Sequence, residues 1–118
     1  MTQVITAAMP VQRDLRMKKG ADWRMTITAK EDDQVTPRDI TGWDVILTIK
    51  DRPNGDQMIQ LTIGDGIALT PASGRMDFEI LSEVVDELEF SRATYDIIII
   101  DANDDKTCPF YGDVELIP

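Results

Sequence analysis

The segment Asp101-Ala-Asn-Asp-Asp105 is rich in carboxylates and matches the first half of a calcium-binding loop of the D-x-N-x-D type. The second half departs from that pattern, because Lys106 takes the place of the expected glycine and Gly112 the place of the bidentate glutamate. A hairpin turn rich in Asn and Asp accounts for the same residues. We favour the turn over the calcium site, and we expect neither a metal nor any other cofactor in this protein.

The remaining residues form no recognisable catalytic motif. The chain has no histidine, which excludes a Ser-His-Asp triad, a Cys-His dyad and a histidine-ligated zinc site. Cys108 has no cluster of basic neighbours in the sequence that would activate its thiol, and we interpret it as a small core residue. No glycine-rich phosphate loop, G-x-S-x-G motif or C-x-x-C motif occurs. The sequence therefore predicts that the protein is not an enzyme.

Charge is distributed unevenly along the chain. Twenty-two acidic residues outnumber 12 basic ones in 118 residues, which gives a formal charge of −10. This balance disfavours binding to nucleic acid, because phosphates attract cations. Residues 1–30 nevertheless hold six basic and two acidic residues, whereas residues 31–118 hold six basic and 20 acidic ones. A basic first quarter on an acidic body could dock onto an acidic neighbour or onto another copy of the chain.

Four basic residues in that first quarter are the candidate interaction residues: Arg13, Arg16, Lys18 and Lys19. The alternative interpretation is that charges at alternate strand positions only keep one face of a sheet hydrated.

The dominant hydrophobic period is two, which is typical of half-buried β-strands. The period is clearest in residues 23–30, 43–50, 76–80 and 93–100. It is weaker in residues 11–17, 57–63, 67–70 and 107–117. Turn signals rich in Gly, Pro, Asn and Asp separate these segments. The pattern predicts an all-β fold, a two-sheet antiparallel immunoglobulin-like β-sandwich.

One short helix is expected near residues 82–89. Ser82 can cap its start, while Val84, Val85 and Leu88 lie on one side of it. By length the chain forms one domain, and we expect an extended N-terminal arm at residues 1–10 and a single β-sandwich at residues 11–118. We expect no membrane helix, since no apolar stretch reaches about 18 residues.

The segment 93–100 is apolar on both faces in its second half, from Ile97 to Ile100. A strand of this kind lies at the centre of a sheet or has one face covered by a partner. Tyr95, near its start, could form a tyrosine corner, in which the hydroxyl bonds to the backbone upstream, or could be an ordinary core or interface tyrosine.

Six short motifs follow one another in a distinctive order: Lys19-Gly-Ala-Asp-Trp23, Thr36-Pro-Arg-Asp-Ile-Thr-Gly-Trp43, Gly66-Ile-Ala-Leu-Thr70, Gly74-Arg-Met-Asp-Phe78, Ala93-Thr-Tyr-Asp-Ile97 and Gly112-Asp-Val114. The series resembles small immunoglobulin-like β-sandwich structural proteins of tailed bacteriophages and prophages. It is similar to the N-terminal domains of upper baseplate proteins. Ala93 departs from the glycine that is common at its position, and the loop at residues 101–106 lacks the usual Asp-Gly turn.

This resemblance implies a non-enzymatic structural component of the virion: a tail, baseplate, connector or fibre-attachment protein. Its partners would be other virion proteins and copies of itself, with no nucleic acid, membrane or small-molecule substrate. It would be made in the bacterial host cytoplasm and end in the virion. A capsid decoration protein is one alternative. A carbohydrate-binding β-sandwich is another, and it would need exposed aromatic side chains, for which Phe90, Phe110 and Tyr111 are the residues not assigned to the core by their phase.

Overall fold

The computed structural model describes residues 2–5, 11–31, 33, 35–52 and 55–118. Its elements are the strands β1 (Thr2–Ile5), β2 (Val11–Gln12), β3 (Leu15–Lys18), β4 (Trp23–Ala29), β5 (Asp44–Lys50), β6 (Gln57–Ile63), β7 (Gly66–Thr70), β8 (Arg75–Ile80), β9 (Arg92–Ile100) and β10 (Lys106–Ile117), the 3-10 turn η1 (Pro71–Ser73) and the helix α1 (Ser82–Val85).

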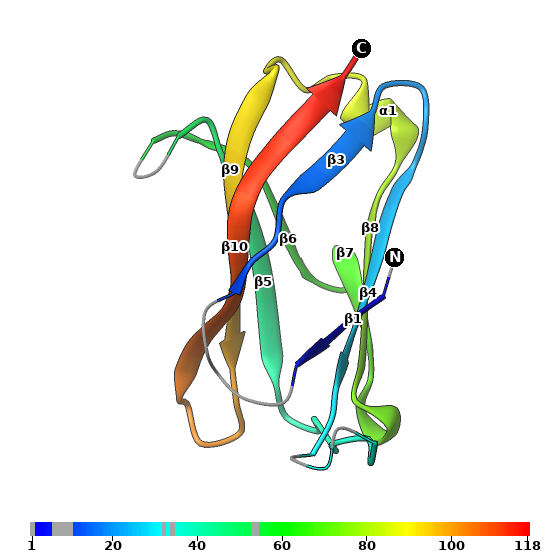
Figure 1. Ribbon diagram of the computed structural model, residues 1–118, viewed down its shortest axis with the longest axis vertical. Helices are drawn as coiled ribbons and strands as arrows, with labels where there is room; N and C mark the ends of the chain where they lie inside the picture. Colours follow the sequence, from blue (N-terminus) through cyan, green and yellow to red (C-terminus); the bar gives the residue numbers. More distant parts are fainter. Residues whose placement is uncertain (1, 6–10, 32, 34, 53–54) are drawn as a thin grey trace.

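The strands form two facing layers (Figure 1). Sheet I has the order β1-β4-β8-β7, and sheet II has the order β6-β5-β9-β10, with β2 and β3 both paired to the free edge of β10. The pairs Thr62–Gly66 and Ile63–Ile67 join β6 to β7, so one hydrogen-bonded path continues around one side of the sandwich. The predicted all-β sandwich is confirmed.

The sandwich is not antiparallel throughout. The pairs β1–β4, β2–β10, β3–β10 and β6–β7 are parallel, whereas the remaining pairs of named strands are antiparallel. Three of the four parallel pairs involve strands near the N-terminus. The beginning of the chain therefore contributes to both layers, through β1 in sheet I and through β2 and β3 in sheet II.

The core lies between the layers and follows the predicted alternation. In β4, for example, Trp23, Met25, Ile27 and Ala29 are all buried, while Arg24 between them is exposed. The same alternation in β9 buries every second residue from Ala93 to Ile99. The largest side chains that are almost completely buried are Phe78, Leu15, Met17, Ile27, Ile40, Leu47, Ile49, Met76 and Ile97.

The helix is shorter than predicted, and its start is held differently. Helix α1 has four residues, Ser82–Val85, and no helix in the described part of the chain is long and apolar enough to cross a membrane. The N-cap residue is Leu81, directly before Ser82, and no side-chain hydrogen bond caps the helix there. Instead, the Asp22 carboxylate, in the turn between β3 and β4, accepts a hydrogen bond from the Ser82 N–H at 2.7 Å. Asp86 accepts one from the Gly20 N–H, also at 2.7 Å, so the turn and the helix hold each other.

The N-terminal segment was predicted to be an arm. Residues 2–5 form β1 in the chain's own sheet I, where they pair with Thr26–Ala29 of β4. Residues 1 and 6–10 of the predicted arm lie outside the described residues. From Val11 onward the chain runs beside β10.

Candidate interaction surfaces

The four basic residues predicted to make contacts lie along one edge of sheet II, and we call them the basic edge: Arg13, Arg16, Lys18 and Lys19. Arg13 precedes β3, Arg16 and Lys18 alternate with buried residues in β3, and Lys19 begins the turn to β4. The Nε atom of Arg16 is 3.4 Å from a carboxylate oxygen of Glu115 in β10. This exposed ion pair neutralises part of the positive charge of the basic edge. Strand β3 and the residues on either side of it, held to β10 by bonds from the Arg13 and Lys19 N–H groups, therefore place these four residues along one edge of the sheet.

A hydrogen bond fixes the backbone at the start of this edge. The hydroxyl of Tyr95, in β9, donates to the carbonyl of Arg13. Burial raises the pKa of Tyr95 well above its ordinary value, with the nearby Asp14 carboxylate adding to the effect. A tyrosine corner reaches only a few residues upstream, whereas this bond links residues 82 positions apart. The sequence could identify the tyrosine, but it could not identify the acceptor.

Gly112 makes the close approach of this segment possible. A Cβ atom at Gly112 would lie 2.5 Å from the Arg13 carbonyl oxygen and 2.8 Å from an Asp14 carboxylate oxygen. That same Asp14 oxygen accepts a hydrogen bond from the Asp113 N–H at 3.0 Å. The connection between β2 and β3 therefore lies directly against β10, in a space that only a glycine leaves open.

The outer face of sheet II carries an apolar centre. Ile46 of β5 and Ile98 of β9 are opposite each other in register, and both point away from the core, as does Ile100 at the end of β9. All three are half-buried. The prediction offered two alternatives for this strand, a central place in a sheet or a covered face. The central place is confirmed, since β9 pairs with β5 on one side and β10 on the other. We call Ile46, Ile98 and Ile100 the isoleucine face.

Two of the shallow hollows on the surface of the described chain open on the outer faces of the sheets. One, of about 350 Å³, lies on sheet II beside Thr48, Asp96 and Tyr111. The other, of about 510 Å³, lies on sheet I and includes Thr26 and Asp77. There the Thr26 hydroxyl donates to Asp77 at 2.7 Å, but the same carboxylate also accepts from Arg75 at 2.9 Å. These three side chains bond to one another and are not arranged as a nucleophile with a free base.

The acidic loop between β9 and β10 has the geometry of a turn. One oxygen of Asp101 accepts hydrogen bonds from the Asn103 N–H at 2.8 Å and from the Asp105 N–H at 3.0 Å. Asp104 takes a left-handed backbone conformation, with φ of 65°. Within the described residues, no three His, Cys, Asp or Glu side chains gather as they would around a metal ion. The structure thus supports the turn interpretation of this segment.

Cys108 lies in the irregular part of β10 and is half-buried. Burial raises the pKa of its thiol, and the negative charge of Asp96 adds to this effect. The thiol points toward the Phe110 carbonyl, with 3.4 Å between sulfur and oxygen. A thiol in such surroundings is a poor nucleophile.

Exposed aromatic surface is scarce. The structure describes all seven aromatic residues, and only Tyr111 is exposed, with 43% of its surface accessible. Phe110 is buried, and Phe90 packs half-buried against the core. Trp43 is half-buried and has the Arg38 guanidinium 5.3 Å from its ring centre, so one of its faces is already occupied by a cation–π contact.

Comparisons with known proteins bear on both family and fold. The family model described as LtfC-like, β-sandwich domain matches residues 9–116. Among solved structures, the N-terminal domain of phage TP901-1 ORF48 superposes with a TM-score of 0.60 at 7% identity, covering 100% of both chains. Extracellular domains 3–5 of Drosophila OTK give a TM-score of 0.34 at 12% identity, covering 97% of this chain and 34% of the other, which is too weak to support an argument. No curated protein matches the chain.

The two stronger similarities agree with the structure. The phage domain has the same overall fold, and the resemblance to β-sandwich proteins of tailed phages is confirmed at this level. The family match spans β2 to β9 and nearly all of β10. The chain therefore belongs to the family of LtfC-like β-sandwich domains.

Proposed function

We propose that this protein is a non-enzymatic structural component of a tailed bacteriophage virion that acts through protein–protein contacts. The full-length similarity to a phage domain supports the proposal most directly. The series of motifs that resembles upper baseplate proteins points to the tail side of the particle, as a tail, baseplate, connector or fibre-attachment protein. The virion is then the site of action, after synthesis in the host cytoplasm.

The surfaces fit a protein of this kind better than an enzyme. Within the described part of the chain, the hollows contain no assembled nucleophile, base and oxyanion donors. What the surface offers instead is a line of exposed cations on an otherwise acidic molecule, from Arg13 to Lys19. The basic edge suits an acidic surface of a neighbouring virion protein, which it would attract over a range of about 10 Å at ordinary salt.

Two alternatives place the protein elsewhere. A capsid decoration protein would use the same kind of surface contact on the head of the particle. A carbohydrate-binding module would need stacking platforms, and Tyr111 is the one aromatic side chain exposed for that purpose. The scarcity of exposed rings favours a structural role over glycan binding.

Labelling of intact particles tests the proposal. An epitope tag fused after Pro118 would be introduced into the phage or prophage that encodes the chain, and purified particles would be examined by immunogold electron microscopy and by mass spectrometry. We expect gold at the tail or its tip and stoichiometric amounts of the protein in the particles. Gold on the head would support the decoration alternative. Particles free of the protein would overturn the structural role, and glycan-array binding would then test the remaining alternative.

A further inference from the structure

The outer face of sheet II has an apolar centre between charged corners. Strand β9 is its middle strand, with β5 on one side and β10 on the other. Ile98 and Ile100 of β9 and Ile46 of β5 form the centre, and Tyr111 of β10 extends it. In the described part of the chain no strand or helix is stacked on this face, since β5, β9 and β10 pair only with strands beside them. Apolar side chains gain stability when a second layer covers them.

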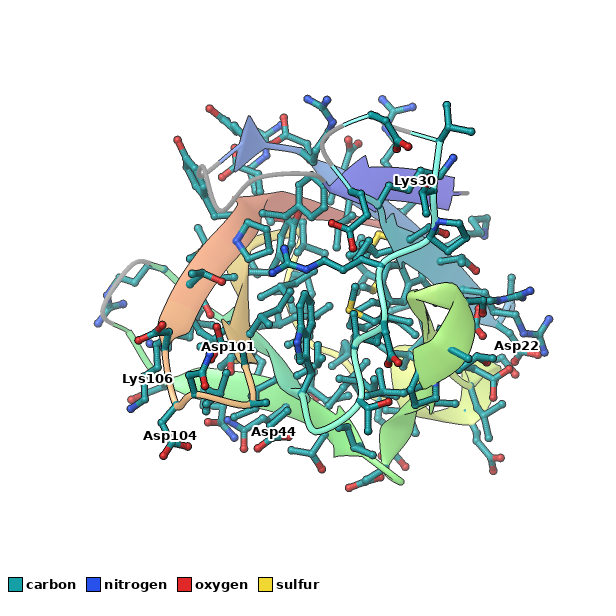
Figure 2. The ribbon with its side chains drawn as sticks, turned by 90° about the horizontal axis from the view of Figure 1, so that it is seen from below. Asp22, Lys30, Asp44, Asp101, Asp104 and Lys106 are labelled. Carbon is teal, nitrogen blue, oxygen red and sulfur yellow. The ribbon has the colours of Figure 1, made fainter. Side chains whose placement is uncertain are left out.

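The charges at one end of this face have opposite signs on the two sides of β9. Ile100 is in register with Asp44 of β5 on one side and with Lys106 of β10 on the other. Figure 2 shows Asp44 and Lys106 pointing outward from this end of the molecule. Asp101, in the adjacent loop, uses one carboxylate oxygen for its own backbone.

The charges toward the other end have the reverse arrangement. Thr94 of β9 is in register with Lys50 of β5 on one side and with Asp113 of β10 on the other. Both charged residues line the hollow on this face. In the described part of the chain, neither Lys50 nor Lys106 forms a salt bridge. The face thus has a lysine without a salt bridge at two diagonal corners and an aspartate at the other two.

A two-fold axis along β9 makes this arrangement complementary to itself. Such an axis, lying between two copies packed face to face, places β5 of one copy over β10 of the other and keeps the residues at the same height. Lys106 then meets Asp44 of the second copy, and Lys50 meets Asp113 of the second copy. The strands keep their direction, which is the aligned mode of sheet packing. We propose that the outer face of sheet II binds a second copy of this chain in this two-fold arrangement.

One residue opposes the proposed contact. Asp96 of β9 points outward between Thr48 and Tyr111, so it lies near the axis and close to Asp96 of the second copy. Two like charges at an interface lower its affinity. The face is also small: strands about 4.8 Å apart and about 3.3 Å per residue give on the order of 500 Å² per copy. A contact of this size lies at the lower end of specific interfaces, and we expect a Kd on the order of 10–100 µM.

Charge reversals with mixing give a direct test. The dissociation constant would be measured by sedimentation equilibrium for the wild type, K106E, D44K and D44K/K106E. By symmetry each reversal replaces two attractive contacts with two repulsive ones, so K106E and D44K alone should each raise Kd at least about tenfold. The double variant should dimerise again. An equimolar mixture of K106E and D44K should form a heterodimer, because the reversed charges then match across the interface.

Matched controls separate this surface from general charge effects. K30E makes the same charge change at a residue away from Asp44 and Lys106 in Figure 2, and E83K changes an exposed acid on α1. Both should dimerise as the wild type does, and thermal unfolding would confirm that all variants are folded. D96N should lower Kd, because it removes the like charges at the axis.

Three results would overturn the proposal. The first is a wild type that stays monomeric up to about 500 µM, which would leave the face to a partner of different sequence. The second is a dimer that K106E leaves intact. The third is a mixture of K106E and D44K that stays monomeric. The test needs only the purified chain, so its failure would not affect the proposed role in the virion.

Discussion

The hydroxyl of Tyr95 donates its hydrogen bond to the backbone carbonyl of Arg13, 82 residues earlier in the chain. Tyr95 belongs to the central strand of sheet II, and Arg13 belongs to the connection between β2 and β3 at the edge of that sheet. The bond therefore fixes the start of the basic edge against β9, the middle strand of sheet II. A surface that must present charges in a fixed register benefits from such an anchor.

Removing this hydroxyl should destabilise the domain. Tyr95→Phe leaves the Arg13 carbonyl without its partner in a partly buried place, and we expect a loss of about 1 kcal/mol in the free energy of unfolding. Chemical denaturation measures it. Tyr111→Phe is the matched control, because Tyr111 is exposed and should tolerate the change. Equal stabilities of the two variants would contradict the role assigned to the Tyr95 hydroxyl.

A methyl group at position 112 should disturb the same region sterically. Gly112→Ala places a Cβ 2.5 Å from a backbone oxygen that cannot move without shifting the β2–β3 connection. We expect a destabilisation of about 1–3 kcal/mol. Changes in the NMR amide shifts should concentrate at Arg13, Asp14 and Asp113. A variant with wild-type stability and wild-type shifts would show that the edge can retract freely.

Asp22 and Asp86 should each contribute separately to the stability of the contact between the β3–β4 turn and α1. Asp22→Ala leaves the Ser82 N–H without its acceptor, and Asp86→Ala does the same to the Gly20 N–H. Each should cost about 1 kcal/mol, as the loss of a capping group does. Faster hydrogen exchange at the Ser82 amide in the first variant and at the Gly20 amide in the second would confirm the assignment. Glu83→Gln, on the same helix but without such a bond in the structure, is the control, and equal exchange in all three variants would argue against it.

The loop around Asp33 should respond to acid. Hydrogen bonds from the Thr36 hydroxyl and from the N–H groups of Thr36 and Val35 lower the pKa of Asp33 from 3.8 to about 2. Because the folded pKa lies below the unfolded one, the stability contributed by this carboxylate is present above the unfolded pKa and is lost as pH falls through about 2. An NMR titration of the carboxyl carbon should give that midpoint, and Thr36→Val should move it upward. A midpoint near the ordinary value in the wild type would contradict these bonds.

The basic edge should govern incorporation into particles without affecting the fold. Lys18→Glu combined with Lys19→Glu reverses two charges that lie in exposed or half-exposed positions. We expect wild-type thermal stability and a marked loss of the protein from purified particles, measured by quantitative mass spectrometry. Glu87→Lys combined with Glu89→Lys changes two charges elsewhere and serves as the control. Normal incorporation of the Lys18/Lys19 variant would mean that another surface makes the essential contact.

The alternation of apolar residues was enough to predict the sandwich and most of its core. Trp23, Met25 and Ile27 are buried as their phase requires, because a strand with period two has only one way to place its apolar face inward. The sequence could not show that the Asp22 carboxylate accepts the hydrogen bond from the first N–H of α1, since this contact joins residues 60 positions apart. Local propensity gives the element, while tertiary contacts decide which side chain completes it.

The candidate surfaces were predictable to different degrees. The basic residues from Arg13 to Lys19 were visible as a charge cluster, but their common edge depends on the parallel pairing of β3 with β10. The isoleucine face was visible only in part, as a strand that is apolar on both sides. Its charged corners depend on the registers that place Lys106 and Asp44 on either side of Ile100. Registers of this kind are set by the whole sheet and cannot be deduced from one strand.

The parallel course of β3 and β10 also has a mechanical consequence. The first strands of sheet II and the last strand of the chain point in the same direction, side by side. Tension applied between Val11 and Ile117 therefore loads the backbone hydrogen bonds that join β2 and β3 to β10 along the strands, so that these bonds share the force and must break together. Hairpin strands pulled from their open end separate one bond at a time. This domain consequently resists tension along its own chain in shear, the loading direction in which a sheet is strongest.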